Sequence, residues 1–320
     1  MSGVFVGIDT SNYTTSVCAI DENGNVLHEA RQVLTVPLGK RGLQQSQALY
    51  QHVTTLPTML DDLRNAVSSR SIVRVASSTR PRSREGSFMP VFQAGILTGH
   101  ALAVASEQSM IETTHQAGHI AAGVATAAMP DRMEQPFAVI HLSGGTTDVL
   151  IAHSNMRDFG VKEWVSGQDL HVGQMVDRIG VQLGFSFPAG KQLEQLARQV
   201  DQDLEIPVIP SSVQRGVPSF SGPLTHAGKL IEAGVNPMLV ASGVFRCIAN
   251  TVEKMIRHMY DQTGIRQILL VGGVASSVLL KERLLSRFDG APQQLYFCDS
   301  HYASDNALGV ALIAKNAWNW

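Results

Sequence analysis

Two histidines at helical spacing are the residues of this sequence best suited to bind a metal ion. His115 and His119 lie four positions apart in the segment His-Gln-Ala-Gly-His. On a helix, side chains at i and i+4 share one face about 5–6 Å apart, so both imidazoles can reach one ion. The spacing alone leaves open a pair of packing or surface histidines. Glutamine follows His115 and cannot act as a general base, which disfavours a metallopeptidase of the His-Glu-x-x-His type.

Two glycine-bearing junctions could bind phosphate oxygens. Ser143-Gly144-Gly145-Thr146 offers backbone amides and hydroxyls with little side-chain obstruction. Gly272-Gly273 follows an apolar, strand-like run and precedes a helix expected to begin near Ala275, and helix N-termini bind anions. An ordinary tight hairpin at the first junction and simple packing at the second stay open as alternatives. The sequence has no Walker phosphate loop and no Gly-x-Gly-x-x-Gly after a strand, which disfavours P-loop and Rossmann folds.

Two aspartates and one basic stretch complete the candidate residues. Asp9 ends the first apolar run, where it could contact a metal-bound or nucleotide-bound water or simply be solvated. Asp305 precedes an apolar segment at residues 307–314 and could cap that final helix. Residues 80–84, Arg-Pro-Arg-Ser-Arg, could grip phosphates as an arm or form a solvated loop. No aromatic residue interleaves with these arginines, so base stacking by this stretch is not expected.

The composition is typical of a compact cytoplasmic protein with two lobes. The chain has 320 residues, of which 44% are hydrophobic and 16% charged. This length exceeds one ordinary domain and predicts two similar lobes with a cleft between them. The net charge of −2 neither requires nor excludes a nucleic acid partner. Three widely separated cysteines show no zinc or redox spacing, which favours a reducing cytoplasm, and no apolar run approaches the roughly 18 residues that span a bilayer.

The beginning of the chain predicts a β-meander followed by helices. Apolar runs at residues 4–9 and 16–20 flank a polar turn, and an Asn-Gly turn leads into a third strand from residue 26. Apolar residues at helical spacing predict a helix over residues 46–66, and a second helix is predicted over 92–105.

The same pattern recurs in the second half of the chain. Two apolar strands at 137–142 and 148–152 flank a small polar turn, so the chain is internally duplicated. Such a duplication predicts a two-lobed α/β fold of the actin, sugar-kinase and Hsp70 type, which is a duplicated ribonuclease H-like fold. We expect the first lobe to comprise residues 1–110 with a C-terminal helix at 305–320, and the second lobe residues 111–304. The turns would face a nucleotide.

Together these segments resemble the tRNA threonylcarbamoyladenosine transferase family, formerly described as O-sialoglycoprotein endopeptidases, over nearly the whole chain. The His-x3-His of the family is similar to His115 and His119, its Ser-Gly-Gly to residues 143–145, and its Thr-Asp-Asn to Ser304-Asp305-Asn306. Further segments correspond in the same order: the family's Phe-Asp-Lys to Val-Asp-Arg at 176–178, and its Tyr-Pro-Gly-Gly to Phe-Pro-Ala-Gly at 187–190. Its Phe-Ser-Phe-Ser-Gly corresponds to Pro-Ser-Phe-Ser-Gly at 218–222, and its Gly-Gly-Val-Ala/Ser-x-Asn to Gly-Gly-Val-Ala-Ser-Ser at 272–277.

The resemblance implies one site for a metal and an adenine nucleotide. The metal, iron or zinc, would be held by His115, His119 and Asp305, and would act as a Lewis acid on a carbonyl or phosphate oxygen. The nucleotide, which is ATP, AMP or an acyl-adenylate, would be bound by Ser143, Gly144, Gly145, Thr146, Asp177, Gly190, Gly272, Gly273 and Ser277. Asp177 and Gly190 would hold the ribose.

The reaction implied is transfer of a threonylcarbamoyl or related carbamoyl group from the adenylate to an acceptor, with adenosine in tRNA as the expected acceptor. A partner protein would supply the adenylate. The alternatives are a carbamoyltransferase acting on a small metabolite and a non-catalytic nucleotide-binding subunit. An ATPase or sugar kinase of this fold would leave the histidine pair without a purpose.

Four departures indicate a divergent paralogue, one of them Ser277 in place of the family's asparagine after Gly-Gly-Val. The family's Ser-Cys-Asp-Glu-Thr appears as Ser-Asn-Tyr-Thr-Thr at residues 11–15, so Tyr13 replaces an acidic residue. A phenol with an ordinary pKa of about 10 is a poor base at neutral pH. The family's Ser-Gly-Leu-Lys-Thr becomes Ser-Gly-Pro-Leu-Thr-His, ending at His226. Its Gly-Pro-Gly-Leu loop is missing, and the basic residues 79–84 stand roughly in that place.

Overall fold

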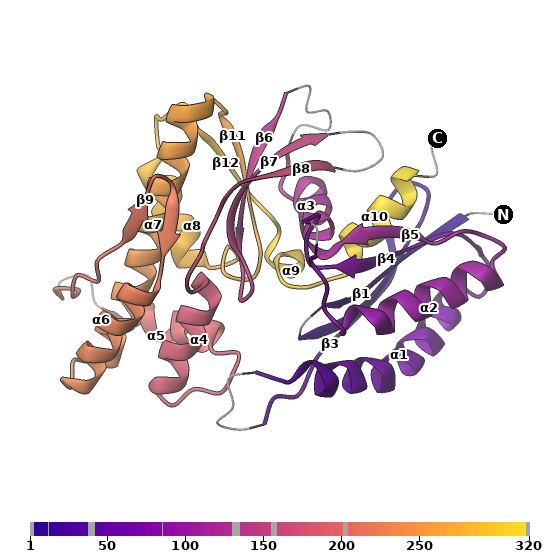
Figure 1. Cartoon of the computed structure of the whole chain (residues 1–320), viewed down its shortest axis with the longest axis horizontal. Coiled ribbons are helices and arrows are strands. Elements are labelled where there is room, and N and C mark those ends of the chain that lie inside the picture. Colours follow the sequence, from indigo (N-terminus) through magenta and orange to yellow (C-terminus); the bar gives the residue numbers. More distant parts are fainter. Residues whose placement is uncertain are drawn as a thin grey trace.

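The computed structural model describes residues 3–11, 13–37, 42–84, 86–129, 135–154, 159–200 and 204–317. In this part the chain forms two five-stranded sheets flanked by helices, and a small two-stranded sheet (Figure 1). The strand orders are β3-β2-β1-β4-β5 and β12-β11-β6-β7-β8. In each large sheet an antiparallel meander of three strands continues into two parallel strands. The two sheets therefore share one topology, which confirms the predicted duplication and the two-lobed α/β fold.

The first lobe, as the name is used below, is the first sheet with its covering helices. Its strands are β1 (Gly3–Ser11), β2 (Thr14–Ile20), β3 (Val26–Val33), β4 (Ser71–Arg80) and β5 (Ile111–Thr114). Its helices are α1 (Gln45–Val67), α2 (Phe92–Ala105) and the C-terminal α10 (Leu308–Asn316). β1 and β2 are buried along their whole length because α1 and α2 cover one face and α10 the other. Val4 and Val6 accordingly face α1 and α2, whereas Phe5 faces α10.

The second lobe is built on the second large sheet. Its strands are β6 (Phe137–Leu142), β7 (Thr147–Ser154), β8 (Phe159–Ser166), β11 (Gln267–Val271) and β12 (Gln294–Phe297), with the separate ribbon β9 (Ser212–Gln214) and β10 (Val217–Ser219). The helices are α3 (His115–Thr126), α4 (Val172–Gln182), α5 (Gly190–Ala197), α6 (Ser221–Glu232), α7 (Pro237–Thr263), α8 (Val278–Arg287) and α9 (Ser300–Ala303). On β6, Ile140 packs toward α4, α7 and α8, and Val139 packs toward α3. The sheet is therefore covered on both faces.

The expected elements appear close to their predicted bounds, with three differences. The C-terminal helix expected at 305–320 is α10, Leu308–Asn316, and residues 318–320 lie outside the described residues. The helix expected near Ala275 begins at Val278, because the hydroxyl of Ser277 accepts a hydrogen bond from the amide of Leu280 and caps α8. The strand β5, Ile111–Thr114, starts where the second lobe was expected to start, yet it pairs with β4 in the first sheet. Among the described residues, no helix is both long and apolar enough to cross a membrane.

Candidate active site

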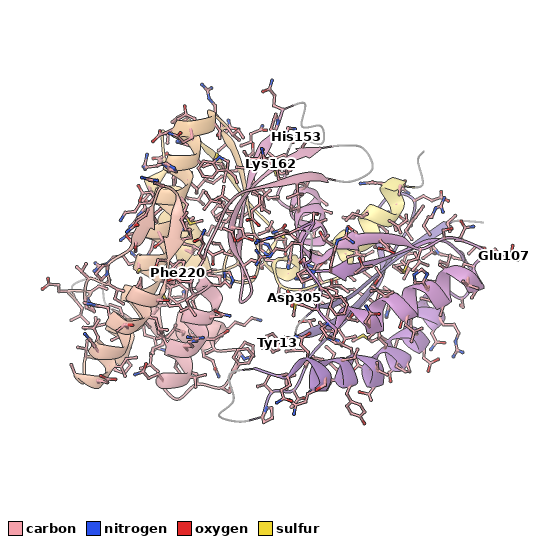
Figure 2. All side chains as sticks on the ribbon, in the orientation of Figure 1. Tyr13, Glu107, His153, Lys162, Phe220 and Asp305 are labelled. Carbon is pink, nitrogen blue, oxygen red and sulfur yellow. The ribbon has the colours of Figure 1, made fainter. Side chains whose placement is uncertain are left out.

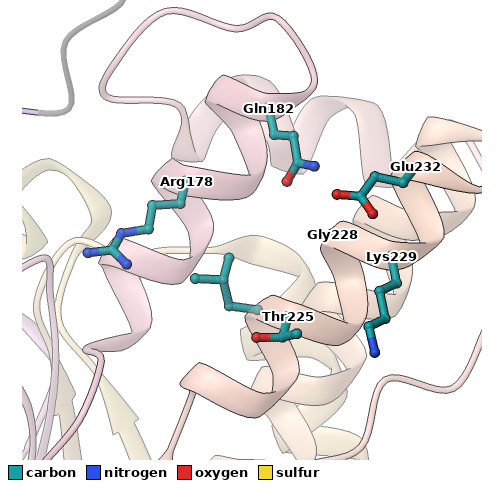
Figure 3. Close-up of a pocket in the computed structure, with 7 residues that line it drawn as sticks. Arg178, Gln182, Thr225, Gly228, Lys229 and Glu232 are labelled. Carbon is teal, nitrogen blue, oxygen red and sulfur yellow. The ribbon is translucent and has the colours of Figure 1, made fainter.

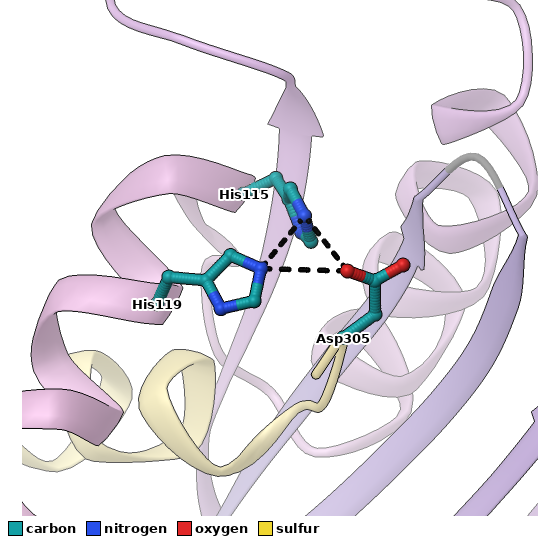
Figure 4. A group of neighbouring side chains, drawn as sticks. All are labelled: His115, His119 and Asp305. Carbon is teal, nitrogen blue, oxygen red and sulfur yellow. Dashed lines mark hydrogen bonds and ion pairs between the residues drawn. The ribbon is translucent and has the colours of Figure 1, made fainter. Parts of the chain in front are cut away.

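Three side chains from distant parts of the chain converge where the two lobes meet. His115 and His119 lie on the first turns of α3, and Asp305 lies in the segment before α10 (Figure 4). The two Nε2 atoms are 3.1 Å apart, and each lies 3.4 Å from Oδ1 of Asp305. Figure 2 shows Asp305 in the middle of the molecule, between the lobes. These three ligand atoms could share one metal ion.

Close packing of α3 against α10 brings the three residues together. A Cβ atom added to Gly309 of α10 would collide with the carbonyl group of Gly118 on α3, so the two helices touch through their backbones. Thr114 caps α3, its hydroxyl accepting a hydrogen bond from the amide of Ala117 at 3.0 Å. The cap fixes where α3 begins, and the close contact fixes its distance from the segment that carries Asp305.

The capping role considered for Asp305 is wrong. The N-cap residue of α10 is Ala307, and the adjacent Asn306 accepts the hydrogen bond from the amide of Leu308, at 3.0 Å. The Asn306 side-chain amide also donates to the carbonyl oxygen of Tyr302, at 2.6 Å. With the helix end and the preceding turn tied by Asn306, the carboxylate of Asp305 is left to face the histidines.

Asp9 is a buried partner of His115, so the solvated alternative for this aspartate is also wrong. Its carboxylate accepts hydrogen bonds from Nδ1 of His115 at 3.0 Å, from the amide of Ser11 and from the hydroxyl of Ser78. Burial by itself would raise the pKa of Asp9, but His115 and these hydrogen bonds outweigh it and lower the pKa below its usual value. An ionised carboxylate only accepts hydrogen bonds, so Nδ1 carries the proton and Nε2 faces the cluster.

The charges around the cluster favour a cation at its centre. Burial would lower the pKa of His115, but Asp9 and Asp305 outweigh it and raise the pKa to about 10. Burial and the neighbouring His115 lower the pKa of His119. Burial would raise the pKa of Asp305, yet hydrogen bonds from both histidines hold it well below its usual value. Two carboxylates thus stabilise one positive charge among the imidazoles, whether a proton or a metal ion carries it.

The turn between β6 and β7 has an open surface. The hydroxyl of Ser143 accepts hydrogen bonds from the amides of Gly145 and Thr146, at 3.2 and 3.1 Å, which fixes the shape of the turn. Gly144 and Gly145 are exposed, and a Cβ atom on either would meet nothing within 4 Å. Packing therefore does not explain the two glycines, whereas an approaching anion would need this unobstructed backbone.

Neighbouring atoms leave no space for a Cβ atom on Gly272, but they leave space for one on Gly273. Gly272 has a φ of +96°, and a Cβ atom there would collide with the carbonyl group of Leu142. Backbone conformation and packing therefore suffice to explain Gly272. A Cβ atom on Gly273 would meet nothing within 4 Å.

The other residues expected to bind a nucleotide lie around helix N-termini of the second lobe. Gly173 on α4 donates its amide to the carbonyl oxygen of Ser143 at 3.1 Å, and Asp177 on the same helix accepts from the amide of Ala189 at 2.8 Å. Gly190 begins α5, which follows Ala189. Burial raises the pKa of Asp177 above its usual value.

Ser277 completes this group and is engaged by two neighbours. Its hydroxyl donates to Oε1 of Glu194 on α5 at 2.9 Å, in addition to capping α8. Contacts thus run from the β6–β7 turn through α4 and α5 to α8. Glu194, which also accepts from the amide of Leu279, was not predicted from the sequence.

Residues 31–312 match the family model TsaD, tRNA N6-adenosine threonylcarbamoyltransferase. The chain belongs to this family. A tRNA N6-adenosine threonylcarbamoyltransferase from Thermus thermophilus is 28% identical over 313 residues, which cover 97% of this chain and 91% of that protein. The enzyme of the same name from Methanopyrus kandleri is 27% identical over 96% of this chain and 86% of its own length. The family resemblance read from the sequence is confirmed.

Solved structures share the fold at low sequence identity. Full-length HypF in its phosphate- and nucleotide-bound form is 12% identical with a TM-score of 0.61, covering 99% of this chain and 46% of that chain. A ROK family glucokinase from Streptomyces griseus is 12% identical with a TM-score of 0.54, covering 98% of this chain and 99% of its own. These similarities concern the fold alone.

The structure shows what surrounds two of the departures from the family pattern, at Tyr13 and in the basic stretch. The pKa of Tyr13 is raised by burial and by the charge of Asp177, so its phenol stays protonated at neutral pH. Arg82, from the basic stretch, is not a solvated side chain, because it is 19% exposed and forms an ion pair with Asp148 at 3.4 Å. Asp148 is buried and was missed, although an aspartate opening an apolar strand was a usable signal.

His141, on β6, was also missed. The ring is buried, its centroid lies 5.0 Å from that of His119, and neither ring nitrogen has a hydrogen-bond partner among the described residues. A histidine within an apolar strand was the available signal.

Cavities also lie away from the histidine cluster. One of about 340 Å³ lies between α4 and α6 and is lined by Arg178, Gln182, Thr225 and Lys229, next in sequence to the departure at His226 (Figure 3). Another, of about 530 Å³, is lined partly by Arg80, Arg84 and Phe88. Phe88 is 63% exposed, so an aromatic ring lies in the same cavity as two arginines of the basic stretch.

Proposed function

We propose that this protein transfers a threonylcarbamoyl group from an acyl-adenylate to N6 of adenosine in tRNA, with one divalent metal ion, iron or zinc, and an adenine nucleotide bound between the lobes. Family membership supports the reaction class and the acceptor. The observation that carries the proposal is the convergence of His115, His119 and Asp305 on one point.

The three ligand atoms fit one ion. Atoms bound to a common ion at about 2.1 Å lie about 3.0–3.4 Å apart in tetrahedral or octahedral arrangements. The separations of 3.1, 3.4 and 3.4 Å fall in this range. Two imidazoles and one carboxylate suit iron and zinc. Asp9 would hold the ring of His115 from behind, as outer carboxylates do for metal-bound histidines. The bound ion would supply Lewis-acid polarisation of a carbonyl or phosphate oxygen.

The chain's own residues would position the adenylate. The open surface of Gly144 and Gly145 would receive its phosphate, and Asp177 with Gly190 would hold the ribose. In the transfer, N6 of the acceptor forms a bond to the carbonyl carbon, the bond from that carbon to the phosphate oxygen breaks, and AMP leaves with the electron pair. Tyr13, with its raised pKa, would donate a hydrogen bond and not take the N6 proton, which passes to the leaving phosphate or to water.

The metal assignment is tested by comparing metal content and ATP binding in wild type and His115→Ala. We expect the variant to lose the ion and to bind ATP more weakly, by about tenfold or more. His100→Ala, an exposed histidine on α2, is the matched control and should keep both properties. Unchanged metal content in His115→Ala would refute the ligand assignment. If wild type still binds ATP after a chelator has removed the ion, the metal site and the nucleotide site are separate.

The transfer reaction is tested by supplying the adenylate enzymatically from labelled threonine, bicarbonate and ATP, and measuring label in tRNA that lacks the modification. Label in tRNA is the expected result. A second candidate is a nucleotide-binding subunit without transfer activity, which is favoured by the tyrosine at the position of the family's acidic residue. ATP binding with no labelled product from tRNA or small acceptors would select that candidate.

A further inference from the structure

Arg82 reaches from the first lobe into the second. It belongs to the segment after β4, which is fixed beside the histidine cluster because the carbonyl oxygen of Pro81 accepts a hydrogen bond from the amide of Gln116 at 3.0 Å. The guanidinium group donates from Nη2 to the carbonyl oxygen of Gly145 at 3.0 Å. Nη1 lies 3.4 Å from Oδ2 of Asp148. A cation of one lobe therefore lies against the β6–β7 turn of the other.

The acidic partners of Arg82 have other hydrogen bonds or contact with water, so the guanidinium group can separate from them. Asp148 is fully buried, but Ser166 donates to its Oδ1 at 2.7 Å and Gln116 donates to its Oδ2 at 3.5 Å. The carboxylate thus keeps hydrogen bonds without the guanidinium, which lowers the cost of separating the pair. The second acidic neighbour, Glu163, is 3.9 Å from Nη1, and 38% of its side chain is exposed, so water screens that ion pair.

The guanidinium also lies at the edge of the unobstructed surface of the turn. Its hydrogen-bond acceptor is the carbonyl oxygen of Gly145, and Gly144 and Gly145 have no neighbour within 4 Å of an added Cβ atom. An anion resting on this surface would come within reach of the same guanidinium after rotation of the arginine side chain. A planar guanidinium binds phosphate through two parallel hydrogen bonds, which a single carbonyl oxygen cannot match.

We propose that Arg82 binds the phosphate groups of a nucleotide seated on the Ser143–Thr146 turn, and that Asp148 holds the guanidinium in place until the phosphate arrives. This inference rests on the proposed nucleotide site. It assigns to the basic stretch a ligand inside the protein, a nucleoside polyphosphate, in place of an external strand of nucleic acid. Asp148 and phosphate compete for one cation, so the two partners of the ion pair have opposite effects on nucleotide binding.

The test is calorimetric titration of ATP and, separately, of adenosine into the metal-loaded full-length protein. Arg82→Gln should weaken ATP binding by about tenfold or more, as expected for loss of a charge-assisted hydrogen bond, and change adenosine binding by less than about twofold. Asp148→Asn should strengthen ATP binding several-fold. Glu163→Gln should strengthen it slightly, and it decides the competition if Asp148→Asn fails to fold. Arg80→Gln, with a partly exposed side chain in the same stretch, is the control and should bind as wild type does.

If the ion pair between Arg82 and Asp148 only held the two lobes together, the variants would have different effects on binding. Variants on both sides of the ion pair would then weaken ATP and adenosine binding together and lower the melting temperature together, and this result overturns the inference. Equal ATP affinity of wild type and Arg82→Gln overturns it while leaving the proposed function intact. Failure of wild type to bind ATP overturns both.

Discussion

The ring of Tyr13 meets the ring of Phe187 edge-on, with centroids 5.2 Å apart and planes inclined by 64°. Tyr13 lies in the turn between β1 and β2 of the first lobe, and Phe187 lies just before α5 of the second. The position at which the family carries an acidic residue is therefore used here for an apolar contact between lobes. Like the ion pair of Arg82 with Asp148, it joins the two lobes beside the proposed site.

We expect Tyr13→Ala to lower the free energy of unfolding by more than about 1 kcal/mol, because it removes an edge-to-face aromatic pair, which contributes about 0.5–1.5 kcal/mol, in addition to the buried area of the ring. Tyr13→Phe keeps the ring and should stay within a few tenths of wild type. Urea denaturation of the three proteins measures both values. An equal loss in Tyr13→Phe would mean that the hydroxyl group, and not the contact with Phe187, stabilises this turn.

Asp9→Asn should weaken metal binding by about 10- to 100-fold, the usual effect of removing a carboxylate behind a metal-bound histidine. The asparagine amide can donate to Nδ1 of His115 and so favour the tautomer whose Nε2 carries the proton. Competition between the protein and a chromophoric chelator for zinc measures the affinity. Asp61→Asn, an exposed aspartate of α1, is the control. An affinity within twofold of wild type would show that Asp9 does not orient the ligand.

We expect the free energy of unfolding to decrease as the pH falls from about 6.5 to 4, because of His52. The ring is buried, and Nδ1 lies 2.8 Å from the hydroxyl of Thr15. Burial lowers the pKa of His52 to about 4, although the charges of Asp9 and Asp305 oppose this effect. The unfolded chain, with an ordinary pKa of about 6.5, takes up the proton first, so acid favours unfolding by at most about 1.4 kcal/mol per pH unit.

The measurement for His52 is the free energy of unfolding at several pH values between 7 and 4, for wild type and His52→Gln. Because the variant lacks this titration, its stability should fall less steeply with acid. His100→Gln, at an exposed position, should follow wild type. Parallel curves for wild type and His52→Gln would assign the acid sensitivity to other groups.

Ser277→Ala should destabilise the protein by about 1 kcal/mol, because it removes the N-cap of α8 and the hydrogen bond to Glu194. Ser277→Asn restores the family's residue, and asparagine is also a good N-cap, so this variant should stay near wild type. Thermal unfolding and ATP titration of both variants are the measurements. Unchanged stability with weakened ATP binding in Ser277→Ala would show that the hydroxyl acts on the nucleotide and not as a cap.

Local patterns in the sequence were enough to predict most of the fold. The strands on either side of Tyr13 and Ser143 are runs of apolar residues bounded by polar turns, and hydrogen bonding within a hairpin depends only on neighbouring residues. The spacing of His115 and His119 is likewise local, because one helical turn fixes it. Asp305 joined these histidines in the prediction only through the family resemblance, since nothing in its own neighbourhood indicates a ligand.

The tertiary structure decided the contacts between residues far apart in sequence. Asp9 meets His115 across 106 positions, and Arg82 meets Gly145 across 63. No periodicity encodes these pairs, because each joins elements of different lobes that meet only when the two lobes pack together. The sequence by itself determined the duplicated strand-turn-strand units, the histidine pair and the family. Packing of the two lobes decided which carboxylates face those histidines, and which arginine lies against the β6–β7 turn.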